Sequence, residues 1–155
     1  MEYQLIIIGF GVSGIATARY AEKNGLNYIV LEKGDTFGGV WCKTEEYTNL
    51  QTHKMFYQFS ELDHDNKTPD FPAKHHLLDY FNNYIEKYNL LKNVRFNEGV
   101  TKVKFSKEEN RWLVETQNGQ YTTEYLAICS GFFNNKRDIP EIPRDKYEKV
   151  NRKLV

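Results

Sequence analysis

The segment LIIIGFGVSG, residues 5–14, joins a run of branched apolar residues to three glycines. The run Leu5–Ile8 is typical of a strand that is buried on both faces of a parallel sheet. Residues 12–24 then carry apolar positions near helical spacing, and Gly25 follows where a left-handed helix cap is expected. Tyr28–Leu31 is a second strand-like run. The opening of the chain is therefore predicted to fold as a strand, a glycine turn, a helix and a parallel strand.

Gly9, Gly11 and Gly14 form the pattern GxGxxG between the predicted strand and the predicted helix. In this context the first glycine permits a tight turn, the second lets the backbone approach a pyrophosphate, and the third lets helix and strand pack closely. The helix N-terminus adds unpaired N–H groups and partial positive charge. We therefore expect Val12 and Ser13 to face the same ligand.

Glu32 follows the second predicted strand, 18 residues after Gly14. A carboxylate at this place can accept hydrogen bonds from both hydroxyls of an adenosine ribose, and it would repel a 2′-phosphate. Lys33 could reach the adenosine side, or it could lie exposed after the strand. Together these residues predict a dinucleotide site, and the alternative is a glycine-rich turn that binds no ligand.

The rest of the chain predicts one long irregular segment, one helix and several strands. Residues 34–74 show no sustained period, and such long loops are usually functional or disordered. Apolar residues within 77–88 recur at helical spacing and predict one face of an amphipathic helix there. Strands are expected at residues 94–96, 101–105, 111–116 and 120–128, with turns at 108–110 and 118–119. The predicted fold class is α/β, a parallel sheet with an added β-hairpin or meander.

Composition excludes several classes of function. The 155 residues suit about one domain, and 21 basic and 21 acidic residues give a net charge of zero. No basic stripe is visible, so nucleic acid is not an expected partner. No apolar stretch is long enough to span a membrane or to form a signal peptide, which favours a cytoplasmic protein. Cys42 and Cys129 are isolated, and we expect buried, reduced thiols and no metal site.

Several further segments resemble those of the flavin-containing monooxygenases and their Baeyer–Villiger relatives. The similar segments are GGVW at 38–41, LQTHK at 50–54, YQFS at 57–60, CSG at 129–131 and the prolines at 140 and 143. They occur in the same order as in that family, after the glycine pattern and Glu32. The resemblance implies a Rossmann-like FAD-binding domain that is incomplete relative to the family.

FAD is the cofactor that the resemblance implies. The resemblance implies that Gly38, Gly39 and Trp41 approach the pyrophosphate, ribityl and flavin portions of FAD. It also implies that Thr52 and His53 lie near the isoalloxazine and that Val100 meets the adenine. The predicted cofactor-binding residues are Gly9, Gly11, Val12, Ser13, Gly14, Glu32, Lys33, Gly38, Gly39, Val40, Trp41, Thr52, His53, Val100, Ser130 and Gly131. No residue is predicted to be catalytic.

The chain departs from the family pattern in three places, one of which is Cys129-Ser130, where the family has alanine and threonine. His53 stands where the family has proline, and it either tunes the redox state of the flavin or is a surface or satisfied polar residue.

The other histidines, His64, His75 and His76, are expected to face solvent or to lie at a helix N-terminus. The family's FxGxxxH signature, which follows the second proline, is not found in residues 144–155.

The resemblance covers only about the first third of such an enzyme. It implies that residues 1–135 are the N-terminal part of an FAD-binding domain, and that 136–155 are a tail or the start of a second domain. NADPH is expected only if that domain or a partner supplies its site, and a homo-oligomer is left open. We therefore expect the FAD-binding portion of a flavin-dependent monooxygenase-like oxidoreductase, not catalytically complete alone. The alternatives are a non-catalytic flavoprotein remnant or interaction module, and an NAD-dependent dehydrogenase-like Rossmann domain.

Overall fold

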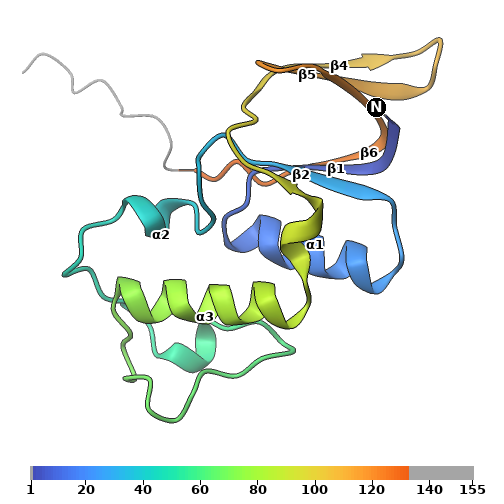
Figure 1. The fold of residues 1–155 in the computed structure, drawn as a ribbon. Helices are drawn as coiled ribbons and strands as arrows, with labels where there is room; N and C mark the ends of the chain where they lie inside the picture. Colours follow the sequence, from blue (N-terminus) through green and yellow to red (C-terminus); the bar gives the residue numbers. More distant parts are fainter. Residues whose placement is uncertain (1, 133–155) are drawn as a thin grey trace, which may run out of the picture.

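The computed structural model describes residues 2–132 (Figure 1). Its elements are β1 (Glu2–Ile8), α1 (Val12–Lys23), β2 (Tyr28–Leu31), α2 (Val40–Lys43), η1 (Lys54–Phe56), α3 (Lys74–Lys87), η2 (Leu90–Asn93), β3 (Val94–Arg95), β4 (Val100–Ser106), β5 (Arg111–Thr116) and β6 (Gln120–Ile128). Every strand and both long helices were predicted from the sequence, with ends that differ by a few residues. The predicted boundary at residue 135, the prolines at 140 and 143, and residues 144–155 lie outside the described residues.

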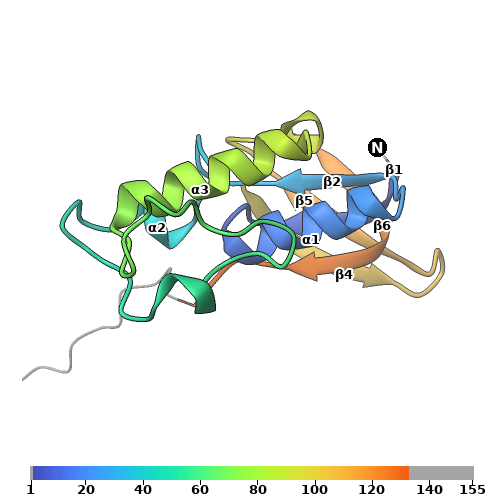
Figure 2. The same ribbon diagram turned by 90° about the horizontal axis from the view of Figure 1, so that it is seen from below.

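The described strands form one six-stranded sheet in the order β3-β2-β1-β6-β5-β4. Strands β3, β2, β1 and β6 run parallel, whereas β6, β5 and β4 form an antiparallel meander. Figures 1 and 2 show α1 and α3 on one face of the sheet, and the β4–β5 hairpin over the other face. The predicted α/β class, a parallel sheet with an added meander, is confirmed.

Strand β1 is the centre of two apolar cores, one on each face of the sheet. Ile7 packs in the cluster under the helices, while Ile6 packs with Val114 and Tyr121 under the meander. Both isoleucines are fully buried, as the continuous apolar run predicted. Full burial of such a side chain stabilises the fold by about 1.5–3 kcal/mol.

Helix α1 crosses the end of β1 at very short range. A Cβ atom placed on Gly14 would lie 2.0 Å from the carbonyl oxygen of Gly9. The helix ends at Lys23, and Gly25 follows with a φ of 65°, in the left-handed region that the sequence predicted. The third glycine of the pattern is therefore required for packing alone, whatever the ligand.

The segment predicted to be irregular, residues 34–74, contains the short helices α2 and η1. Neither is longer than 4 residues, so neither has a hydrophobic period that a sequence could reveal. The predicted hairpin turn at Asn118-Gly119 is present as a loop of three residues, 117–119. Neither Asn118 nor Gly119 has a positive φ. Thr116 closes this loop by accepting hydrogen bonds from both backbone N–H groups.

The two cysteines are free, as predicted, but each is half-buried rather than buried. Cys42 donates to the carbonyl of Gly39, and Cys129 lies at the end of β6. Within residues 2–132, no helix is long and apolar enough to cross a membrane, and no group of three candidate ligands could hold a metal ion.

Replacing Gly14 by alanine should separate α1 from β1. The added methyl group would overlap the Gly9 carbonyl, and we expect Gly14→Ala to lower the free energy of unfolding by about 3 kcal/mol. Gly119→Ala is the matched control, because no described atom lies within 4 Å of its added Cβ. Urea titrations of both variants measure the difference. Equal stability of the two variants would show that the helix and the strand do not meet at Gly14.

Candidate functional site

The carboxyl ends of β1, β2 and β6 lie at one edge of the sheet because these strands run parallel. The turns after β1 and β6 touch, since a Cβ atom on Gly9 would lie 2.6 Å from the carbonyl oxygen of Cys129. The Cys129 N–H also donates to the carbonyl of Ile8 at 2.8 Å. The structure thus brings the glycine turn and the Cys129-Ser130-Gly131 turn side by side.

The N-terminus of α1 opens toward this edge. Gly11 is the N-cap residue, and no side chain among residues 2–132 caps the helix at that position. Val12 and Ser13, the first two residues of the helix, are exposed. The first backbone N–H groups of the helix therefore face an open surface with their partial positive charge, which favours an anion such as a pyrophosphate.

The second glycine pair packs directly against the first glycine turn. Gly38 N–H donates to the carbonyl of Phe10 at 3.0 Å. Gly39 has a φ of 60°, and a Cβ atom on it would lie 3.0 Å from the Cα of Gly11. Two motifs separated along the sequence are thus in backbone contact beside the N-terminus of α1, where Val40 is exposed.

Glu32 joins the turns that follow β1 and β2. Its Oε2 accepts the Phe10 N–H at 2.7 Å, and its Oε1 accepts the Gly34 N–H at 2.8 Å. Because each carboxylate oxygen can accept about two hydrogen bonds, each keeps capacity for one ribose hydroxyl. Sequence reasoning predicted the ribose role for Glu32 and missed the role in fixing the two turns.

The residues predicted for the adenosine side lie around the end of β2. Lys33 is exposed, and its Cβ would lie 3.5 Å from a Cβ placed on Gly99. Val100 begins β4 and packs half-buried against the core on the meander face of the sheet. Lys33 and Val100 are therefore held on the side of the site to which Glu32 belongs.

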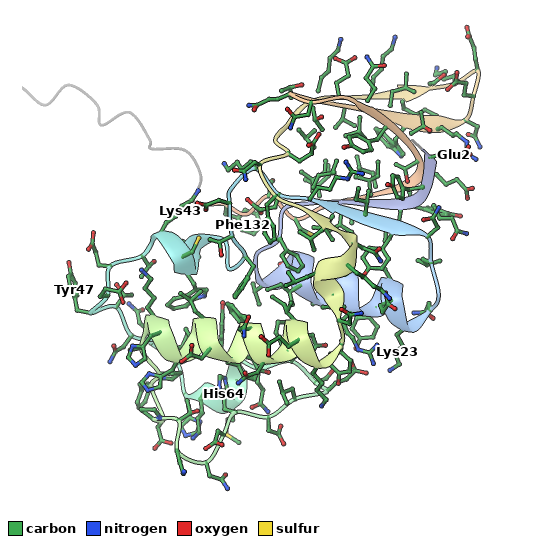
Figure 3. All side chains as sticks on the ribbon, in the orientation of Figure 1. Glu2, Lys23, Lys43, Tyr47, His64 and Phe132 are labelled. Carbon is green, nitrogen blue, oxygen red and sulfur yellow. The ribbon has the colours of Figure 1, made fainter. Side chains whose placement is uncertain are left out.

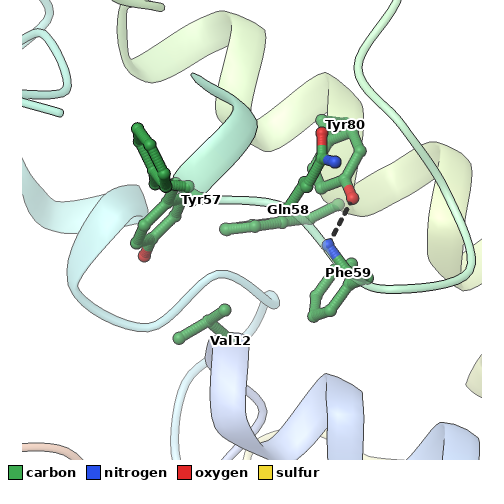
Figure 4. A pocket seen from close by; sticks show the side chains of 7 residues that line it. Val12, Tyr57, Gln58, Phe59 and Tyr80 are labelled. Atoms are coloured by element: carbon green, nitrogen blue, oxygen red, sulfur yellow. Dashed lines mark hydrogen bonds between the residues drawn. The ribbon is translucent and has the colours of Figure 1, made fainter. Parts of the chain in front are cut away.

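A pocket of about 140 Å³ adjoins the N-terminus of α1 (Figure 4). Its lining residues are Val12, Phe56, Tyr57, Gln58, Phe59, Tyr80 and Phe81. Figure 4 shows the Phe59 N–H donating to the Tyr80 hydroxyl, which holds the 56–59 segment against α3. The pocket is smaller than the roughly 300–1,000 Å³ of complete ligand sites, so it can take only part of a large ligand.

Trp41 contacts this segment through Tyr57. Its Nε1–H donates to the Tyr57 hydroxyl at 2.7 Å, and the two rings meet edge to face with centroids 5.9 Å apart. The indole N–H that the family resemblance placed near the flavin is thus bonded to Tyr57. No pattern in the sequence indicated this pairing, since both residues lie in the segment 34–74, which shows no sustained period.

Thr52 and His53 are not among the residues that line the pocket beside Val12. Thr52 is exposed. His53 caps η1, with its Nδ1 accepting the Met55 N–H at 3.3 Å, and its Nε2 lies 3.3 Å from an Asp70 carboxylate oxygen. Of the two interpretations of His53, the geometry supports a satisfied polar residue.

The expectation that His64 faces solvent is wrong, because its side chain is buried beneath α3 (Figure 3). Its ring stacks on Tyr80 with centroids 4.0 Å apart, and its Nε2 is 2.9 Å from the carbonyl oxygen of Tyr57. His75 and His76 lie in the first turn of α3, as expected. Burial lowers the pKa of His76.

Glu61 anchors the pocket segment to both helices, a role that sequence reasoning missed. Its carboxylate accepts two hydrogen bonds from Arg19 at 2.8 and 3.1 Å and one from Lys23 at 3.0 Å, both on α1. The Tyr84 hydroxyl of α3 donates to the same carboxylate at 3.3 Å. The bonds from Lys23 and Arg19 hold the pKa of the Glu61 carboxyl below its usual range.

Comparison with known proteins identifies related chains. The family described as pyridine nucleotide-disulphide oxidoreductase matches residues 6–154. The probable indole-3-pyruvate monooxygenase YUCCA4 of Arabidopsis thaliana is 32% identical over 140 residues, covering 89% of this chain and 33% of that protein. The probable flavin-containing monooxygenase 1 of Arabidopsis thaliana is 30% identical over 170 residues, covering 92% of this chain and 32% of that protein.

A crystal structure of OTEMO in complex with FAD and NADP superposes on this chain with a TM-score of 0.82. The two sequences are 24% identical, and the match covers 91% of this chain and 28% of that one. The chain spans about a third of the length of the curated relatives it matches. The similarity to flavin monooxygenases that the motifs indicated is confirmed by these comparisons.

Acid should weaken the anchor at Glu61. Because the folded pKa is lowered, the stability that the ionised carboxylate contributes is complete above its ordinary pKa of 4.5 and is lost as pH falls below that value. We expect Glu61→Gln to lower the urea midpoint at pH 7 and to make that midpoint fall less between pH 5 and about pH 3. Glu109→Gln, at an exposed position, is the control. The same acid-induced fall in both variants would exclude Glu61 as the group responsible.

Proposed function

The chain belongs to the family of pyridine nucleotide-disulphide oxidoreductases, and we propose that it forms the FAD-holding part of a flavin-dependent monooxygenase. The observation that carries this proposal is the contact between Gly11 and Gly39 beside the uncapped N-terminus of α1. This contact joins the dinucleotide pattern to the segment that resembles the flavin monooxygenases.

The pyrophosphate fits between the helix N-terminus and the glycine pairs. Its two negative charges meet the first N–H groups of α1, and its oxygens can come close because Gly11 and Gly39 carry no side chains. A Cβ atom on either glycine would crowd the Cα of the other, at 3.4 Å for a Cβ on Gly11 and 3.0 Å for one on Gly39, so a side chain there would push the two segments apart. The residues present therefore fit an anion of this kind.

The adenosine ribose fits at Glu32, whose two oxygens each retain acceptor capacity beyond the bonds from Phe10 and Gly34. A 2′-phosphate at this position would meet the carboxylate charge, so FAD and NAD fit better than NADP. Lys33 and Val100, at the same end of β2, would border the adenine.

The flavin half is assigned to the pocket beside Val12, where Tyr57 and Phe56 provide aromatic walls. Trp41 bonds Tyr57 and thereby fixes the wall on the side of the second glycine pair. When bound, flavin supplies hydride acceptance and reaction with O₂, while the protein orients it and excludes water. A plain NAD-dependent dehydrogenase would share Glu32 and the first glycine turn, but it would leave the segments at 38–41 and 50–54 without a role.

Oxygenation and the use of NADPH are proposed for the whole protein, because the chain spans about a third of its relatives. We assign residues 1–135 to the FAD-binding domain and residues 136–155 to a tail or the start of a second domain. The nicotinamide site would then come from that domain or from a partner chain. A folded module that binds flavin without catalysis uses the same geometry, and turnover measurements on the whole protein separate the two.

FAD should bind more tightly than FMN, NAD or NADPH. FAD alone engages the adenosine, pyrophosphate and flavin contacts together, while NADPH adds repulsion at Glu32. Titration calorimetry with the four ligands gives the ranking. Tightest binding of NAD would favour the dehydrogenase alternative, and FMN affinity equal to that of FAD would remove the adenosine assignment.

Glu32→Gln should weaken FAD by tenfold or more. The substitution removes the charge and one acceptor oxygen. Each hydrogen bond to a charged acceptor contributes about 1.5–3 kcal/mol to binding, and a loss of about 1.4 kcal/mol raises the dissociation constant tenfold. The midpoint of thermal unfolding is measured for the same variant, because a lower midpoint would show that the hydrogen bonds from Phe10 and Gly34 to residue 32 are lost. Glu109→Gln should leave FAD affinity unchanged. A folded Glu32→Gln protein with unaltered affinity would place the ribose elsewhere.

A further inference from the structure

Glu98 is a buried carboxylate between β3 and β4, with 5% of its surface exposed. Within the described part of the chain, three side chains donate to it: Thr116 at 2.5 Å, Asn118 at 2.9 Å and Tyr121 at 3.2 Å. All three donors belong to β5, β6 or the loop between them. Hydrogen bonds from Thr116 and Asn118 hold the pKa of the Glu98 carboxyl below its usual range, so the group is ionised at neutral pH.

The backbone beside Glu98 is bonded to the end of β2. The Glu98 N–H donates to the carbonyl of Glu32 at 2.9 Å, and the Asn97 N–H donates to the carbonyl of Gly34 at 2.8 Å. The Glu32 N–H returns a bond to the carbonyl of Arg95 at 2.9 Å. Residues 95–98 therefore run alongside residues 32–34 and fix their path.

The Asn118 side chain links these two sets of bonds. Its amide group donates both to the Glu98 carboxylate and to the carbonyl of Asn97 at 3.1 Å. Asn97 itself has a φ of 55°, in the left-handed region, so its conformation depends on such partners. The β5–β6 loop is thus connected through Glu98 and Asn97 to the backbone of Glu32 and Gly34. These are the residues beside the proposed ribose position.

We propose that Glu98 is a positioning residue for adenosine: it fastens the β5–β6 loop and residues 95–98 to residues 32–34, and so sets where the Glu32 carboxylate meets the ribose. This inference rests on the proposed function. Glu98 itself bonds side chains of its own chain, and in this proposal it acts on the ligand only through Glu32 and Gly34. Its effect is confined to the adenosine half, because the pocket beside Val12 is anchored separately by Glu61.

Glu98→Gln is the test variant because it keeps the size of the side chain. An amide has one acceptor oxygen and an NH₂ donor, so the three donors around it cannot all remain bonded. Tyr121→Phe removes one donor and keeps the ring, which makes it the milder variant if Glu98→Gln does not fold. Glu109→Gln, in the exposed turn between β4 and β5, is the matched control.

The full chain and its variants are titrated with FAD, ADP and FMN by calorimetry. We expect Glu98→Gln to weaken FAD and ADP about tenfold and Tyr121→Phe to weaken them about threefold, with FMN affinity within about twofold of the parent. Hydrogen exchange on the ligand-free chain should show faster exchange of the Gly34 and Asn97 amides in Glu98→Gln. Glu109→Gln should match the parent in every measurement.

The failures are distinguishable. A parent chain that binds neither FAD nor ADP overturns the proposed function and this inference with it. A parent that binds both, together with folded variants that bind them equally well, overturns the role of Glu98 and leaves the proposed function standing. Equal weakening of FAD, ADP and FMN shows general destabilisation, which also overturns a role specific to adenosine.

Discussion

The other parts of the site depend on the close packing of α1 against the end of β1, where Gly14 meets the carbonyl of Gly9. At this separation the helix begins directly over the turn that follows the strand, so its first N–H groups face the carboxyl edge of the sheet. Gly38 then bonds Phe10 in that turn, and Gly39 packs on Gly11. A longer distance between helix and strand would leave these glycine segments without a common surface.

Two carboxylates anchor the two halves of the site by different means. Glu61 forms ion pairs with Arg19 and Lys23. Because these charges lie near solvent, salt screens them and weakens the attachment that Glu61 provides. Glu98 accepts hydrogen bonds from neutral donors and also interacts with the charge of Arg95, in a buried position where salt screens charges much less. The bonds of Glu61 should therefore respond to ionic strength more strongly than those of Glu98.

The sequence predicted the parts of the fold that carry local signals. The apolar run Leu5–Ile8 and the left-handed Gly25 have meanings that do not depend on distant residues, and both were found as expected. His64 was misplaced because it lies in the polar stretch Asp63–Asn66, which suggests exposure to solvent, whereas its burial depends on packing against Tyr80 of α3. The bonds of Trp41 to Tyr57 and of Glu98 to the β5–β6 loop depend likewise on tertiary packing.

The two tryptophans of the chain lie in different layers of the fold. Trp41 packs against the core under the helices, beside Tyr57, whereas Trp112 meets Phe105 across the β4–β5 hairpin with centroids 5.1 Å apart. Their intrinsic fluorescence is thus divided between the side of the sheet that carries the pocket beside Val12 and the meander. A chain that retains only Trp41 would report optically on the surroundings of the pocket, and one that retains only Trp112 would follow the hairpin.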